Sequence, residues 1–377
     1  MSLQDSLNYY NQSEKSKNKA NTVKSKQSKK DKDLPLKLKV SSALATTGYY
    51  TKINVGISAI NERRLADVTD VDVLAIRFDQ TFTRNMIAVS CKSGDARGFS
   101  PAREIFYLRG VLNYIQAEYG VVAFSHKIIP PHLRDLGQRL NILALSGNDI
   151  DEWCKSLIDG LPLCGYFEEP KFEEYVNSWK RLSNQGLTNY INTDFWFYHD
   201  YRNLQNVIYY MRKLQIKING DEPWHSVVIM DIAAQLCLTI FDLCHHIRLM
   251  GLFSIVDTTA AYLFGGSSSY KARRDLYMKV QQLLSSTGIL SPKGSTLPPL
   301  EPIYTKNLAE LVIRFIEKPN ASILIPQILQ DNIWRNLGAT GAPARIDKIQ
   351  LVAEKLSQDL LDFLKFATDG GWTIKIQ

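Results

Sequence analysis

The sequence of 377 residues has no long uninterrupted apolar run and no apolar leader. Its most apolar stretch, residues 225–252, contains Asp231 and Asp242, whereas a membrane span needs about 18 or more apolar residues with few charges. The first 30 residues lack an apolar segment and include Glu14, which argues against a secretory signal. We therefore expect a cytoplasmic protein without membrane contacts, in which residues 225–252 form a buried helix.

Cysteine is scarce, and several motifs that define common enzyme classes are missing. The five cysteines are an odd set with no C-x-x-C spacing, so the sequence supports neither a disulfide framework nor a zinc ribbon. It also contains no G-x-S-x-G, no Walker A motif and no G-x-G-x-x-G, which are typical of hydrolase, nucleotide and dinucleotide sites. Any chemistry must come from another arrangement.

Net positive charge is scarce outside the N-terminus. The chain has 45 basic and 38 acidic residues, a net charge of +7, and residues 1–40 hold ten Lys against four acids, or +6. Residues 1–33 are rich in Lys, Ser, Asn and Gln, which is typical of a disordered arm. We expect the arm either to contact nucleic-acid phosphates or to be a solubilising tail. The lysines expected to make such contacts are Lys24, Lys26, Lys29 and Lys30.

Residues 34–149 read as one α/β domain. Short β-rich runs alternate with amphipathic helical patterns in the order α, β, β, β, α, β, α, β, which predicts a mixed central sheet flanked by helices. Helices are expected at 36–47, 102–118 and 131–140, and strands at 49–58, 71–78, 86–91, 121–125 and 142–145.

Residues 150–377 are mainly helical in pattern, which predicts a second, α-helical domain. We expect this domain to contact a target, a partner protein or further copies of the chain. Large aromatics that begin at Phe195 and Trp196 are expected to pack in a core rather than to stack bases. Helices are predicted at 171–184, 200–215, 225–250, 270–286, 306–318 and 346–367.

Two charged residues stand at the ends of neighbouring predicted strands. Asp72 opens the apolar run VLAI, and Lys92 closes the run IAVSC. In one hairpin the two residues would lie side by side near its open end. A carboxylate that holds Mg²⁺ and a Lys that orients the attacking water suit phosphodiester hydrolysis.

The segments GYYTKINV, TDVDVLAI, IAVSCKSG and VVAFS follow one another in an order that resembles the PD-(D/E)XK nuclease superfamily, over about residues 36–147. The resemblance implies a restriction-endonuclease-like fold and a nuclease that uses one or two Mg²⁺ ions, with Mn²⁺ as a substitute. On the positions that match, Asp72 corresponds to the first acid and Lys92 to the final Lys, and Cys91 stands at the variable position between them.

Ser90 departs from this pattern, because it stands where the family has its second acid, and a hydroxyl is a weaker ligand for a hard cation. Some type II restriction endonucleases look similar, with Ser or Cys before x-Lys and the carboxylate moved onto the following helix. Glu104, in SPARE on the first turn of that helix, is therefore the expected second metal ligand. Glu62 and Asp70 are supporting candidates, and Ser90 is expected to make at most an outer-sphere contact.

We therefore expect a Mg²⁺-dependent DNA endonuclease, as in restriction or antiviral defence, with Asp72, Lys92 and Glu104 as the catalytic residues. Arg97, in the loop after Lys92, and Arg103 are the expected DNA contacts near the site. The alternative is a catalytically inactive subunit that keeps the nuclease fold and serves DNA binding or assembly. A further alternative is a helical interaction protein whose sheet is unrelated to nucleases.

Overall fold

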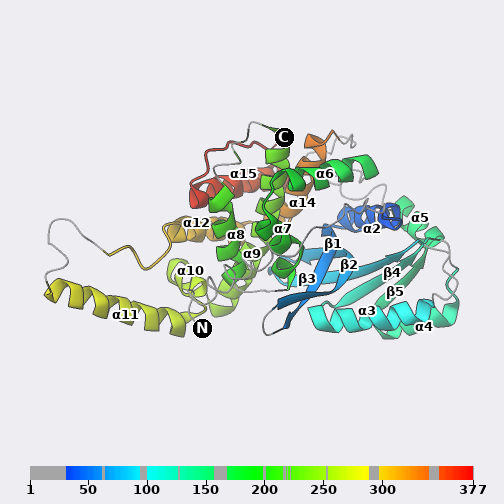
Figure 1. The fold of residues 1–377 in the computed structure, drawn as a ribbon, viewed down its shortest axis with the longest axis horizontal. Helices are drawn as coiled ribbons and strands as arrows, with labels where there is room; N and C mark the ends of the chain where they lie inside the picture. The colour runs from blue at the N-terminus through cyan, green and yellow to red at the C-terminus, as the bar shows by residue number, and fades with distance from the viewer. Residues whose placement is uncertain are drawn as a thin grey trace, which may run out of the picture. The chain divides into compact units, whose positions relative to one another are not determined.

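In this computed structural model, residues from Asp33 onward form one compact unit (Figure 1). The parts of the chain that the structure describes are 31–61, 64–93, 100–125, 128–156, 168–197, 201–214, 218, 220, 222–251, 254–287, 297–338 and 348–376.

The N-terminal half of this unit is a five-stranded mixed sheet with helices on both faces. Strands β1, β2 and β3 pair in antiparallel fashion, and β3, β4 and β5 pair in parallel, in the spatial order β1-β2-β3-β4-β5. The predicted order of elements and the α/β class are confirmed, and the restriction-endonuclease-like assignment stays a prediction. The elements are α2 (Leu34–Thr46), β1 (Tyr50–Asn61), β2 (Arg64–Phe78), β3 (Arg84–Lys92), α3 (Pro101–Ile115), β4 (Tyr119–Phe124), α4 (Pro131–Arg139), β5 (Ile142–Ser146) and α5 (Gly147–Ser156).

Alternation along the strands explains how the sheet packs, because successive side chains point to opposite faces. Val89 and Cys91 of β3 lie in one buried cluster with Val40 of α2 and Ile150 of α5. Ala88 lies in the other cluster, with residues of α3. Figure 1 shows the sheet between α2 on one side and α3 and α4 on the other.

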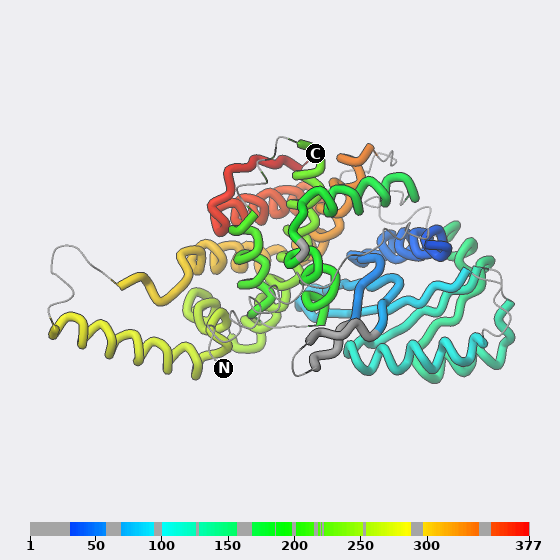
Figure 2. The backbone as a smooth tube through the Cα atoms, viewed as in Figure 1, coloured from blue at the N-terminus to red at the C-terminus, as the bar shows by residue number. Residues whose placement is uncertain are grey.

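The remainder of the unit is helical. Figure 2 follows the chain through this part to α15, which packs against α12, α13 and α14. The six long helices that the sequence predicts are confirmed, with ends that differ by up to a few residues, whereas α7, α10, α13 and α14 were not anticipated. The elements are α6 (Glu169–Arg181), α7 (Gln185–Asn192), a 3₁₀ turn η1 (Asp194–Trp196), α8 (Tyr201–Leu214), α9 (Pro223–Met250), α10 (Ile255–Leu263), α11 (Ser267–Ser286), α12 (Thr305–Glu317), α13 (Pro319–Ser322), α14 (Ile325–Asn336) and α15 (Lys348–Thr368).

Helix α9 is the core of the helical part. It is the one helix of the described residues that is long and apolar enough to span a membrane, and 94% of its most apolar window is buried inside the protein. By length and composition alone such a helix is weak evidence for a membrane. Because α9 is buried inside the protein, the buried helix expected in this stretch is confirmed over residues 225–250.

The sheet and the helical part share one hydrophobic cluster. Phe78 and Phe82, at the β2–β3 turn, pack against Phe241 of α9, with ring centroids 5.0 and 5.3 Å apart. Trp196 is buried and stacks on Tyr50 of β1 at 6.2 Å, so the expected core role is confirmed for Phe195 and Trp196, whereas Tyr209, further along the same aromatic cluster, is exposed. The division into domains at residues 149 and 150 stays a prediction.

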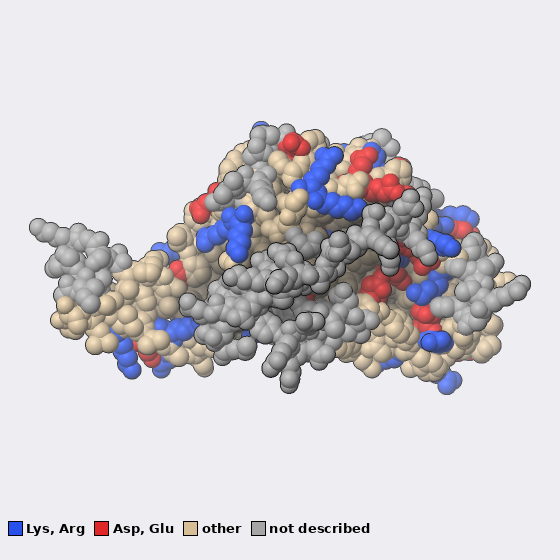
Figure 3. Space-filling model, in the orientation of Figure 1, with Lys and Arg blue, Asp and Glu red and all other residues tan. Residues whose placement is uncertain are grey.

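Charges on the visible face of the molecule are mixed in sign. In Figure 3, Lys and Arg side chains lie among Asp and Glu side chains on the described surface. This mixture agrees with the nearly neutral balance of the sequence beyond residue 40.

Candidate functional site

The candidate site forms where β2 and β3 separate. Val73 and Val89 are the last pair of the ladder between β2 and β3. Beyond this pair, β2 contacts the main chain of β3 through the side chain of Asp72. Its Oδ2 accepts a hydrogen bond of 2.7 Å from the backbone N–H of Cys91. Asp72 is 8% exposed, so its carboxylate has a defined position where the pairing of β2 with β3 ends.

Strand β3 presents its residues to the site by alternation. Ser90 and Lys92 continue the face of Ala88, which is the face that α3 covers, whereas Cys91 points into the opposite core. The Nζ of Lys92 lies 3.7 Å from Oδ2 of Asp72. The expected neighbourhood of Asp72 and Lys92 is therefore present.

Helix α3 brings the second carboxylate. The helix begins at Pro101, where the fixed φ of proline suits the first turn. Glu104, in that turn, is 8% exposed and faces inward. Its Oε2 accepts a hydrogen bond of 3.1 Å from the hydroxyl of Ser90. Ser90 therefore contacts the acid that was expected to replace the family's second carboxylate.

These side chains line one cavity of about 380 Å³. Asp70 and Arg103 lie at its rim, where both are exposed. Its floor is apolar and includes Val89, Leu108 and Val111. A cavity of this size, with charged side chains above an apolar floor, has room for a small charged group and its water.

The electrostatics favour a charged Lys92. Burial lowers the pKa of its amine, but the negative charges of Asp72 and Glu104 outweigh this effect and raise the pKa above its ordinary value. Lys92 is therefore an ammonium ion in the free protein, suited to attract an oxyanion or to orient a water.

A second lysine, which the sequence analysis did not identify, also contacts Asp72. The Nζ of Lys37, on α2, lies 2.9 Å from Oδ1 of Asp72 and donates to Oδ1 of Asn54 at 2.7 Å. Lys37 is 4% exposed. The signal for its burial was helical spacing. Lys37 follows Leu34 by three residues and precedes Ser41 by four, so the three residues share one face of α2, and this face is buried.

The structure does not describe the remaining expected site residues. Glu62, Arg97, Lys24, Lys26, Lys29 and Lys30 lie outside the described residues. Among the residues that the structure describes, no group of three or more His, Cys, Asp or Glu is arranged to hold a metal ion. Asp72 and Glu104 are thus a pair of acids and not a larger cluster.

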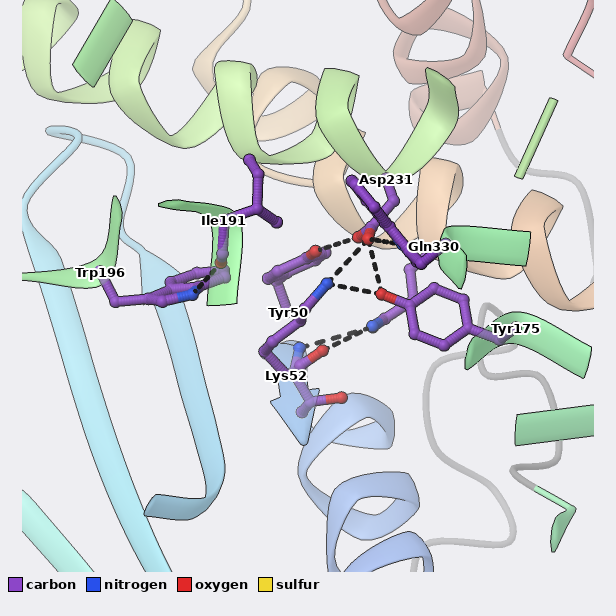
Figure 4. A network of polar contacts seen from close by, with 9 residues as sticks. Tyr50, Lys52, Tyr175, Ile191, Trp196, Asp231 and Gln330 are labelled. Atoms are coloured by element: carbon purple, nitrogen blue, oxygen red, sulfur yellow. Dashed lines mark hydrogen bonds and ion pairs between the residues drawn. The ribbon is translucent and has the colours of Figure 1, made fainter. Parts of the chain in front are cut away.

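A second buried polar cluster lies between β1 and the helical part (Figure 4). The carboxylate of Asp231, on α9, accepts hydrogen bonds from the hydroxyls of Tyr50 (2.8 Å) and Tyr175 (2.6 Å) and from the indole of Trp179 (2.9 Å). It also forms an ion pair of 2.7 Å with Lys52. The adjoining cavity is about 20 Å³, enough for about one water, so this cluster is structural.

The pKa of Asp231 reflects these partners. Burial raises it, but the charge of Lys52 and the hydrogen bonds from Lys52, Tyr175 and Tyr50 hold the pKa below its ordinary value. The carboxylate therefore stays ionised inside the protein.

The chain was compared with protein-family models, with curated proteins and with solved structures, and none of them matches it.

Proposed function

We propose that this protein is a metal-dependent DNA endonuclease of the PD-(D/E)XK type. The observation that carries the proposal is that Asp72, Lys92 and Glu104, from β2, β3 and α3, line one cavity. Hydrolysis of a phosphodiester requires compensation of the phosphate charge and a positioned water. Two carboxylates that bind a cation, together with an ammonium ion, meet both requirements.

The donor set suits Mg²⁺, which is commonly held by one or two carboxylates together with waters and substrate phosphates. Asp72 and Glu104 would hold the ion, and Glu104 forms no ion pair with a cation among the described residues. Mn²⁺, which also prefers oxygen ligands, would substitute. The bound ion would stabilise the negative charge that develops on the phosphate.

Lys92, Ser90 and Arg103 have different tasks in this proposal. The ammonium of Lys92 attracts the phosphate and orients the attacking water. The hydroxyl of Ser90 holds Glu104 in place through its hydrogen bond. Arg103, exposed at the rim, is placed to contact a neighbouring phosphate. Arg97 and the N-terminal lysines are proposed to add further phosphate contacts.

Cleavage of supercoiled DNA in Mg²⁺ or Mn²⁺ tests this proposal. We expect Asp72→Asn, Lys92→Ala and Glu104→Gln to lose cleavage by about 100-fold or more. Lys92→Ala removes a positive charge near the phosphate, and each of the other two changes removes a ligand of the cation that would compensate the phosphate charge. Ser90→Ala removes only the hydrogen bond to Glu104 and should keep most of the activity. Circular dichroism checks that each variant is folded. Wild-type activity in Glu104→Gln would refute the assignment of this acid.

The second candidate is an inactive nuclease-fold subunit that binds DNA or assembles with a partner. It is favoured by one observation, that Asp72 already contacts the ammonium groups of Lys37 and Lys92. DNA binding without cleavage or cation binding would support this candidate. For both candidate functions, a cytoplasmic role in restriction or phage defence rests on analogy alone and stays a prediction.

A further inference from the structure

The two oxygens of the Asp72 carboxylate have different environments. Oδ2 accepts the N–H of Cys91 and lies near Lys92, which lines the cavity. Oδ1 contacts Lys37, which reaches it from α2 and does not line the cavity. A cation that enters the cavity would therefore meet an Asp72 carboxylate whose Oδ1 already forms an ion pair with Lys37.

The position of Lys37 is itself held by a side chain of β1. Asn54, which binds the Lys37 ammonium, has a left-handed backbone conformation with φ of 58°. The ladder of β1 and β2 passes from the pair Ile53–Val73 to the pair Val55–Val71. Asn is one of the few residues that adopt this conformation at modest cost. Three elements, α2, β1 and β2, thus converge on one Lys–Asn–Asp contact.

We propose that Lys37 is a positioning residue that sets the cation affinity and selectivity of the site, an inference that rests on the proposed function. Lys37 restricts Asp72 to binding a cation through Oδ2 alone, and its positive charge opposes a second cation nearby. Mg²⁺ and Mn²⁺ tolerate one-oxygen carboxylate ligands completed by water, whereas Ca²⁺ takes more ligands and often both oxygens of a carboxylate. Lys37 therefore disfavours Ca²⁺ more than it disfavours Mg²⁺ or Mn²⁺.

The test is direct cation binding to the full chain without DNA. Free Mn²⁺ is counted by electron paramagnetic resonance, and Ca²⁺ by equilibrium dialysis, for wild type and Lys37→Met. We expect the variant to bind Mn²⁺ about tenfold more tightly, because a nearby positive charge is removed. The gain for Ca²⁺ should be larger, because Oδ1 is also released.

Lys39→Met is the matched control, since Lys39 lies on the same helix but is exposed and pairs with Asp151. It should leave both affinities unchanged. Lys37→Gln, which keeps a neutral hydrogen-bond donor beside Asp72, is the second variant if Lys37→Met is unstable. It should show the gain for Mn²⁺ as well, because the positive charge is absent in both variants.

The outcomes separate this inference from the proposed function. Unchanged or weaker binding in the Lys37 variants, while wild type binds Mn²⁺, overturns the role of Lys37 and leaves the proposed function intact. A gain that persists when Asp72→Asn is added also overturns it, because the gain would not pass through Asp72. Absence of Mn²⁺ binding in wild type and all variants overturns both.

Discussion

Replacement of Asp231 by Asn should be among the most destabilising single changes in this protein. The change leaves Lys52, which is 6% exposed, without its buried counter-charge. Removing one partner of a buried ion pair typically costs about 3–5 kcal/mol. The Asn side chain also presents an amide N–H₂ toward groups that donate to Asp231, namely Tyr50, Tyr175 and Trp179. We therefore expect a loss of about 3–5 kcal/mol in the free energy of unfolding.

Urea unfolding at pH 7, followed by circular dichroism, measures this loss. Asp242→Asn is the matched control, because Asp242 lies on the same helix and pairs with Arg84 at 3.2 Å, with a side chain 19% exposed against 3% for Asp231. The control should cost less than Asp231→Asn, because burial raises the pKa of Asp242 whereas the partners of Asp231 lower its pKa, so the charged form of Asp242 is the less stabilised of the two. Equal losses in the two variants would contradict the reasoning, because burial of the Lys52–Asp231 pair would then have no special effect.

The same pair predicts a pH dependence whose sign follows from the lowered pKa of Asp231. A carboxyl group whose pKa is lower in the folded state stabilises the protein above its unfolded pKa of about 3.9. That contribution is lost as the pH falls through the folded-state pKa. The difference in stability between wild type and Asp231→Asn should therefore shrink below about pH 4. If the difference in stability between wild type and Asp231→Asn stayed constant from pH 7 to pH 3, the lowered pKa of Asp231 would be refuted.

Two further predictions concern helix α3 and the N-terminal arm. Gly120→Ala should cost about 1–3 kcal/mol and reduce DNA cleavage, since its Cβ would lie 2.9 Å from Leu108 and displace the helix that carries Glu104. Gly110→Ala on α3, whose Cβ meets nothing within 4 Å, is the control and should be neutral or stabilising by up to about 1 kcal/mol in urea unfolding. Deletion of residues 1–30, which keeps Asp33 and its hydrogen bond to Ser93, should weaken DNA binding and flatten its dependence on salt. An unchanged salt slope in a fluorescence anisotropy titration would mean that the arm does not contact phosphates.

Much of the local structure could be predicted from the sequence, because it depends on periodicity. Short β-rich runs predicted all five strands, and helical spacing predicted the helices on either side of them. The extent of β2 could not be predicted in this way. It begins at Arg64 instead of residue 71, because pairing with β1 continues past a register shift at Ile57 and Ser58. Such pairing depends on a neighbouring strand and not on the segment alone.

The candidate site was predicted in part. Ser90, Lys92 and Glu104 stand near the ends of elements whose order was recognisable, whereas Asp72 lies within β2. All four line one cavity. Lys37 was missed because nothing in its own segment indicates that its ammonium contacts Asp72. The contact requires α2 to lie across the sheet beside Asn54, whose φ is positive, and that placement is a property of the whole fold.

The sequence by itself therefore determined the strands and the long helices, the charged arm and most residues with chemical potential, since these follow from local pattern and composition. Only the tertiary structure decided which charges meet. Lys52 and Asp231 are 179 positions apart, and neither segment indicates the other. A buried charge requires a partner close by in space, so the pairing of Lys37 with Asp72 and of Lys52 with Asp231 was decided when the helices packed on the sheet.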